Sequence, residues 1–136
     1  MIRNIPFNAV QKAIYELLSK GQNVPVYSSI TTGREAFPYI YLGAFEGQPV
    51  NENKTLVQHV ISQTLDVWST SKGKAEVNAI MDDAAYLLTK YNLQVEGYRQ
   101  VGTADITNYQ VIGERYENGI SAYHGVLIAR YIIEQI

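Results

Sequence analysis

The most regular pattern of apolar and polar positions lies between Val57 and Trp68. Positions alternate there at a period of two, which places successive side chains of a strand on opposite faces. One set contains Val57, His59, Ile61, Gln63, Leu65 and Val67, and the opposite set contains Gln58, Val60, Ser62, Thr64, Asp66 and Trp68. The first set is mostly apolar, so the pattern predicts a central strand that rests one face on the core.

Two segments follow the helical spacing of three and four residues instead. The first runs from Asn4 to Gly21, where Pro6 suits the opening turn and Gly21 suits a left-handed cap. Its apolar face contains Phe7, Val10, Ile14, Leu17 and Leu18. These features predict a helix at the start of the chain.

The second helical segment follows the central strand and ends near Asn92. Its apolar face contains Val77, Ile80, Met81, Ala84, Leu87, Leu88 and Tyr91. We expect Ser71 or Gly73 to cap it, with Glu76 answering a Gly73 cap in the first turn. Asp82 and Asp83 are expected to be solvated on its outer surface.

Further strands are predicted on both sides of these elements. Val24–Ser29 contains Pro25 and suits a short edge strand, whereas Phe37–Phe45 is aromatic and β-branched and should pack partly on both faces. Ile106–Tyr116 and Ile120–Ile136 are expected to form a hairpin through Glu117-Asn118-Gly119. Leu93–Gly97 could begin one more short strand.

Polar segments separate these elements. Thr31–Arg34 is expected to form a turn, and from Glu46 the composition favours a mobile loop of about eight residues before the central strand. Tyr98–Asp105 suits a bulge or a second loop. The resulting order, αβββαββ, predicts an α+β fold with a mainly antiparallel β-sheet and two helices packed on one face. Residues 1–136 are expected to form a single domain.

Charge and composition narrow the function classes. The net charge is −2, and no basic run is present that would neutralise nucleic-acid phosphates, which disfavours sequence-specific nucleic-acid binding. The chain has no cysteine, no apolar run long enough to span a bilayer and no signal-like start, so a cytoplasmic protein is expected. The 11 tyrosines suit protein interfaces as well as half-exposed strands.

Candidate chemical groups are sparse. His59 and His124 are the only histidines and could share a metal or act as a base and its partner if their strands are neighbours. Neither cysteine nor a closely spaced carboxylate completes a ligand set, so packed or hydrogen-bonded histidines are the favoured interpretation. Trp68 is expected to be a core anchor or the rim of an interface. No glycine-rich phosphate loop or nucleophile motif is present, and we expect no enzyme activity, metal or cofactor.

Several segments, in their order along the chain, carry a family resemblance from about Ala9 to Arg130. They are FNAVQKAIYELLSKG in the first helix, Pro38-Tyr39-Ile40, Leu65-Asp66-Val67-Trp68-Ser69, Gly73 with Glu76, and Tyr123-His124-Gly125-Val126-Leu127. Together they resemble the tail-completion family of long-tailed bacteriophages and prophages, whose members join tails to heads.

The resemblance implies a structural virion protein without an enzymatic role. Its members form a ring, expected to be a hexamer, that docks the tail tube protein to the connector or completion protein of the head. Such a protein would reside at the head–tail junction of the virion and in the host cytoplasm during assembly, and DNA would pass through the ring.

We hypothesise that the polar segments supply the partner contacts. The candidate interface residues are Gln48, Asn51, Glu52, Asn53, Lys54 and Thr55 before the central strand, with Arg99 and Asn108 in the later segment. A tail terminator that caps tube growth is the alternative within phage structure. A small ligand-binding or enzymatic domain around His59, Trp68 and His124, or an interaction domain unrelated to phages, are further alternatives.

Overall fold

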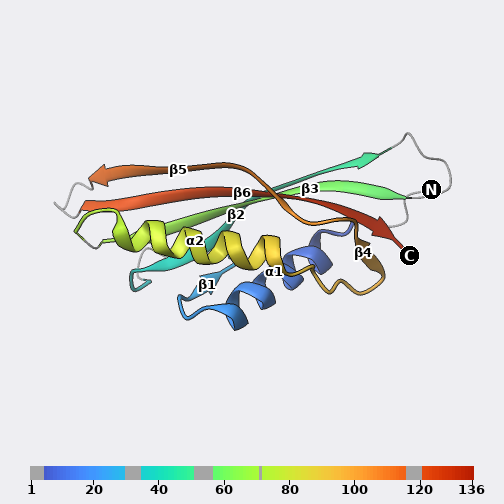
Figure 1. Cartoon of the computed structure of the whole chain (residues 1–136), viewed down its shortest axis with the longest axis horizontal. Helices are drawn as coiled ribbons and strands as arrows, with labels where there is room; N and C mark the ends of the chain where they lie inside the picture. Colours follow the sequence, from blue (N-terminus) through green and yellow to red (C-terminus); the bar gives the residue numbers. More distant parts are fainter. Residues whose placement is uncertain (1–4, 30–34, 51–56, 71, 116–120) are drawn as a thin grey trace.

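A computed structural model describes residues 5–29, 35–50, 57–70, 72–115 and 121–136. Two helices and six strands follow one another along the chain (Figure 1). They are α1 (Phe7–Gly21), β1 (Val26–Tyr27), β2 (Tyr39–Val50), β3 (Gln58–Ser69), α2 (Ala75–Lys90), β4 (Tyr98–Gln100), β5 (Asp105–Arg115) and β6 (Ser121–Gln135). No helix in the described ranges is long and apolar enough to cross a membrane.

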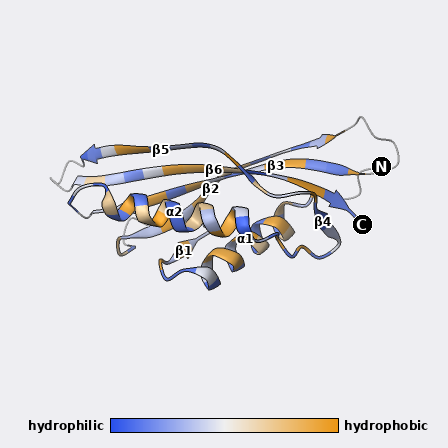
Figure 2. Cartoon of the chain, in the orientation of Figure 1, coloured by the Kyte–Doolittle hydropathy of each residue, from blue (hydrophilic) through white to orange (hydrophobic). Residues whose placement is uncertain are grey.

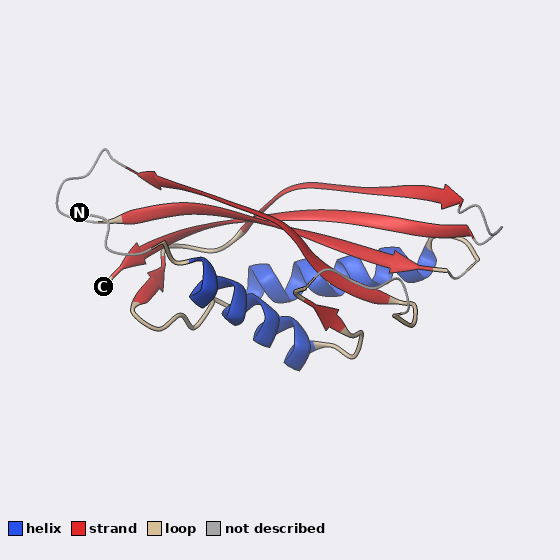
Figure 3. Ribbon diagram, turned by 180° about the vertical axis from the view of Figure 1, so that it is seen from behind, coloured by secondary structure: helices blue, strands red, loops and turns tan. Residues whose placement is uncertain are grey.

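The strands form one sheet in the order β1-β2-β3-β6-β4, and β5 also pairs with β6. Only the short β1–β2 ladder is parallel among the described pairings. Both helices lie on the same side of the sheet, as the views from the two sides show (Figures 1 and 3). The predicted fold class, a mainly antiparallel sheet with two helices on one face, is therefore confirmed.

The burial pattern of β3 matches the alternation of apolar and polar residues that predicted this strand. Every second residue from His59 to Ser69 is buried on the helix side, and the residues between them are half-buried on the other side. β6 follows the same rule from Leu127 to Ile133. Bands of hydrophobic and hydrophilic residues alternate along the long strands (Figure 2).

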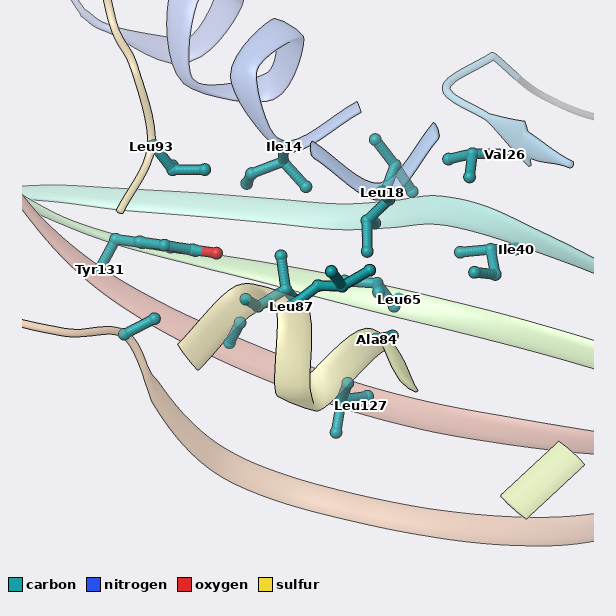
Figure 4. Packing of buried hydrophobic residues seen from close by; sticks show 14 of the residues in the cluster. Ile14, Leu18, Val26, Ile40, Leu65, Ala84, Leu87, Leu93, Leu127 and Tyr131 are labelled. Carbon is teal, nitrogen blue, oxygen red and sulfur yellow. The ribbon is translucent and has the colours of Figure 1, made fainter. Parts of the chain in front are cut away.

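The core fills the space between the helices and the sheet. Figure 4 shows side chains of α1, α2 and the strands meeting there, among them Ile14, Leu18, Ala84, Leu87, Leu65 and Leu127. Each fully buried aliphatic side chain contributes roughly 1.5–3 kcal/mol to folding. Gly125 lets α2 approach β6, because an added Cβ would lie 2.4 Å from Met81 Sδ and 3.0 Å from Val77 Cγ2.

The structure corrects the predicted start of the loop at Glu46. β2 continues to Val50 and pairs with β3 as far as Gln58. A register irregularity between Leu42 and Phe45 shifts the alternation. The polar residues after it therefore lie in a strand whose outer edge has no partner among the described residues, where glycine and proline are tolerated.

The predicted helix ends are also corrected. Gly21 is not a left-handed cap: it is the last residue of α1, and an added Cβ would lie 2.6 Å from Leu87 Cδ2. Close packing of the two helices explains this glycine. Glu76 does not answer Gly73; its Oε1 accepts a hydrogen bond of 2.6 Å from Ser69 Oγ, and α2 has Lys74 at its N-cap position.

The strands predicted at Val24–Ser29, Ile106–Tyr116 and Ile120–Ile136 are confirmed with shifted boundaries as β1, β5 and β6. Two predictions before β5 are wrong. Leu93–Gly97 contains no strand, and the Leu93 N–H donates to Gln100 Oε1 at 2.7 Å. Tyr98–Asp105, expected to be a bulge or loop, contains β4, because Tyr98–Gln100 pairs with the end of β6. The predicted Thr31–Arg34 turn, the Ser71 cap and the Glu117-Asn118-Gly119 hairpin turn lie outside the described residues.

Candidate interaction surface

No described helix covers the face of the sheet opposite α1 and α2 (Figure 3). We call it the open face. Between Val60 and Trp68 its β3 side chains are all half-buried, and those of β6 between His124 and Ile132 are half-buried as well. Aliphatic, hydroxyl and charged side chains alternate on it.

A polar cluster lies at one end of the open face. It comprises Asp66 and Trp68 of β3, Glu114 of β5 and His124 of β6, and we call it the histidine cluster. The His124 ring stacks on Trp68 with a centroid distance of 4.0 Å and an angle of 6° between the planes. Its Nε2 lies 2.7 Å from Asp66 Oδ1, and its Nδ1 lies 3.3 Å from Glu114 Oε1. The cluster thus links three strands through one imidazole.

The geometry of the histidine cluster suits a structural role, in which His124 holds neighbouring strands together. Both ring nitrogens face carboxylate oxygens, and both can donate when the imidazole is protonated. The groove of about 450 Å³ at this end is lined by Glu114 but not by the other three members of the cluster. The four groups contact one another through these hydrogen-bond distances and the ring stack.

His59 and His124 do not meet. β3 and β6 are neighbours as the sequence suggested, but His59 lies opposite Ile133 on the helix side, whereas His124 lies opposite Trp68 on the open face. His59 is buried, and burial lowers the pKa of its imidazole. Among the described residues, no three His, Cys, Asp or Glu side chains are grouped as a metal site.

A second polar arrangement lies at the other end of the open face. Val50, Gln58, Glu134 and Arg99 are successive partners across β2, β3, β6 and β4, and we call them the terminal row. Glu134 is buried, pairs with Arg99 and accepts a hydrogen bond of 3.2 Å from Gln58 Nε2. The hydrogen bonds from Arg99 and Gln58 hold the pKa of the Glu134 carboxyl below its ordinary value.

The terminal row gathers part of the predicted interface. Gln48 is exposed in β2, two residues before Val50, and Arg99 is exposed in β4. Asn108 is exposed as well, but it pairs with Ile128, about 20 Å along β6 from Glu134. Asn51, Glu52, Asn53, Lys54 and Thr55 lie outside the described residues.

The sequence interpretation missed two groups of residues. Trp68 was expected to anchor the core or to lie at the rim of an interface. It is not a core residue: it lies on the open face with His124, because its position in the alternation matches the polar set. Asp66 acquires a histidine partner from 58 positions away in the sequence. The alternation of β3 and β6 carried this signal, but only their register brings the two side chains together.

The helix side offers a further surface. An open groove of about 720 Å³ lies between the end of α1 and α2, and its lining includes Leu17, Leu87, Tyr86 and Tyr91. The two tyrosines are among the exposed large side chains of the chain. Aromatic side chains with a polar tip are enriched at protein interfaces. The structure thus locates two of the tyrosines that the composition had suggested for an interface, in this groove.

Comparisons with known proteins identify the family and the fold of the chain. The model of the family described as "Tail completion protein gp17" matches residues 12–134. A solved structure described as "Virion of native gene transfer agent (GTA) particle" contains a similar chain, with 21% sequence identity and a TM-score of 0.75. The match covers 96% of this chain and 98% of that chain, and it shows a shared fold. No curated protein matches the chain.

Proposed function

The chain belongs to the tail completion protein gp17 family, and we propose that it docks the tail tube of a phage-like particle to the connector of the head. Family membership over residues 12–134 carries this proposal and assigns the chain a structural role in the tail of the virion. The proposal has three further parts. The protein docks the tube to the connector, it assembles as a ring, and it resides in the host cytoplasm before assembly.

The surfaces support a joining role. A subunit of a closed ring needs two different contact surfaces for its neighbours and further surfaces for the structures above and below it. The open face is about 30 Å long between the terminal row and the histidine cluster, since Trp68 lies ten positions after Gln58 along β3. Its two ends differ in chemistry, which suits contacts with two different partners. A hexamer is the expected assembly.

A structural role also fits the histidine cluster better than catalysis does. General acid–base chemistry needs a histidine within reach of a substrate proton. Each nitrogen of His124 is instead directed at a carboxylate oxygen, and its ring is covered on one side by Trp68. The cluster therefore fixes strands rather than offering a reactive group.

The function is tested with particles produced without the protein. Electron microscopy should show DNA-filled heads and complete tails of normal length as separate structures, and adding purified protein should join them. Overlong tubes would identify a tail terminator instead. Joined particles at the normal yield would refute the proposal.

We propose that the end of the sheet that carries the terminal row contacts the tube or the connector. Deletion of Glu52–Lys54, which lie in the sequence between β2 and β3, should leave a folded protein that no longer joins tails to heads. Circular dichroism of the purified variant checks the fold. Pull-down with tube protein and with connector protein then identifies the partner that is lost. Normal infectious particles would contradict this assignment.

A further inference from the structure

β5 is an edge strand with an unusually exposed surface. β6 pairs with one side of it, and no strand in the described ranges pairs with the other. None of its residues is buried, and Tyr109 and Ile112 are 72% and 42% exposed. A long edge with free backbone groups is a template for pairing with another strand, and isolated soluble proteins usually protect it.

The opposite edge of the sheet has a matching opening. β1 pairs with Ile40 and Tyr41 of β2, so the segment of β2 from Phe45 to Val50 has β3 on one side and no described strand on the other. The order β2-β3-β6-β5 places this segment and β5 at opposite edges. Within the described ranges, one molecule therefore presents two different edges without a neighbouring strand.

The directions of the two edges are compatible. β2 is antiparallel to β3, β3 to β6 and β6 to β5, so β5 runs opposite to β2. Gln48 is level with Ile132 of β6 and Gln110 is level with Val126, six residues or about 20 Å apart along the strand. When copies are arranged with their sheets side by side in the same orientation and displaced by this distance along the strands, β5 of one copy meets the Phe45–Val50 segment of the next in antiparallel fashion. Gln110 of β5 and Gln48 of β2 both lie on the open face, where their amides can pair without like charges.

We propose that β5 pairs with the Phe45–Val50 segment of β2 in a second copy of the chain, so that the sheet continues from subunit to subunit. This inference rests on the proposed ring, because a contact between two unlike edges repeats in one direction until rotation closes it. Backbone hydrogen bonds supply the pairing, as in strand addition to a sheet edge, and Tyr109 and Ile112 lose exposed apolar surface.

The absence of cysteine makes a cross-linking test direct. The double variant Gln48→Cys with Gln110→Cys, and a second one with Asn108→Cys in place of Gln110→Cys, cover two possible registers. Three strand spacings separate β2 from β5 within one copy, about 14 Å, which exceeds the reach of a disulfide of about 7 Å between Cα atoms. A disulfide between these cysteines must therefore join two copies.

Oxidation of assembled particles and of concentrated purified protein should convert at least one double variant into a ladder of dimers, trimers and larger species. The single variants should remain monomers on a denaturing gel. Dimers of a single β5 variant would show a symmetric β5–β5 contact and overturn the inference. A complete lack of cross-links in particles with joined heads and tails would overturn it while leaving the joining function intact.

A second variant separates assembly from folding. Ile112→Lys places a charge on the exposed edge, a feature that blocks strand pairing. It should abolish the multimers while keeping the thermal midpoint of the monomer, and Asn78→Lys on the exposed side of α2 is the matched control. Multimers that persist in Ile112→Lys would exclude β5 from the contact.

Discussion

Gly43 of β2 faces the carboxylate of Asp66 on the neighbouring strand. A Cβ added at Gly43 would lie 2.2 Å from Asp66 Oδ2, while Asp66 Oδ1 lies 2.7 Å from His124 Nε2. The glycine therefore leaves the space that the aspartate needs to reach its histidine partner. One small residue, one carboxylate and one imidazole connect β2, β3 and β6.

Replacement of Gly43 by alanine should displace Asp66 from His124. We expect a loss of about 1–3 kcal/mol in the free energy of unfolding, because the new methyl group overpacks a fixed contact. Urea denaturation measures the loss, and fluorescence of Trp68 reports on the stacked ring. Gly113→Ala is the matched control, since its added Cβ would meet only Tyr123 at an ordinary distance of 3.6 Å. Equal stability of the two variants would contradict the role of Gly43.

His59 predicts a pH dependence of stability. Burial lowers its pKa below the ordinary value of 6.5, so the unfolded chain takes up a proton at a higher pH than the folded chain does. The free energy of unfolding therefore decreases as the pH falls below about 6.5, because protonation of His59 favours the unfolded chain. Glu134 affects stability in a different pH range. Its pKa is lowered in the folded protein, so the stability that its carboxylate contributes is lost only as the pH falls below the ordinary pKa of 4.5.

The measurement compares the free energy of unfolding of the wild type and of His59→Gln between pH 8 and pH 5. The wild type should lose more stability than the variant over this range, because glutamine stays neutral, and subtraction removes the other titrating groups. Parallel curves for the two proteins would show that His59 does not cause the slope.

β6 is the central element of the sheet. It pairs with β3 along most of its length on one side and with β5 and then β4 on the other. Its last residues join the core and the terminal row, because Ile133 is fully buried and Glu134 binds Arg99 and Gln58. Stability therefore depends on residues near the end of the sequence.

Removal of residues 133–136 should prevent folding or cost more than about 2 kcal/mol, because a buried isoleucine and the partner of β4 are lost together. Removal of Ile136 alone is the control, since this side chain is 85% exposed. Soluble yield and urea denaturation distinguish the two proteins. A fully stable shorter variant would show that β4 and the end of β6 add little.

Local patterns in the sequence predict the elements but not their register. The alternation from Val57 to Trp68 and the helical spacing around Ile14 and Leu88 identified β3, α1 and α2, because burial of one face imposes a period. The irregularity after Leu42 shifts the alternation of β2, and the extension of β2 through Glu46–Val50 depends on pairing with β3, which the polar composition of this segment does not reveal. The residues of the candidate site likewise divide into those that the local sequence indicates and those that only strand register brings together. Gln48 and Arg99 were named from their polar surroundings, whereas the histidine cluster arises from register alone.

At the scale of the whole molecule, the two helices and the sheet share one core in the described part of the chain. Side chains of α1 and α2 occupy the same buried cluster as those of β2, β3 and β6. We therefore predict that helices and sheet unfold together as a single domain. Trp68 is the only tryptophan and reports on the open face, whereas circular dichroism at helical wavelengths reports on α1 and α2.

The two signals should give the same midpoint in urea at one protein concentration. The His124→Ala variant, which changes the environment of the indole, is a control for the assignment of the fluorescence signal. Separate midpoints would show that the helices form an independent unit and would contradict a single domain.

The order of the strands also has a consequence for the folding pathway. β3 needs β6 as its neighbour, and β4 and β5 pair with nothing else in the described chain. Before β6 has docked, the chain can form its helices and the β2–β3 hairpin but cannot close the sheet. Since β5 gains its place beside β6 at the same time, the edge proposed for assembly does not exist until β6 has paired with β3.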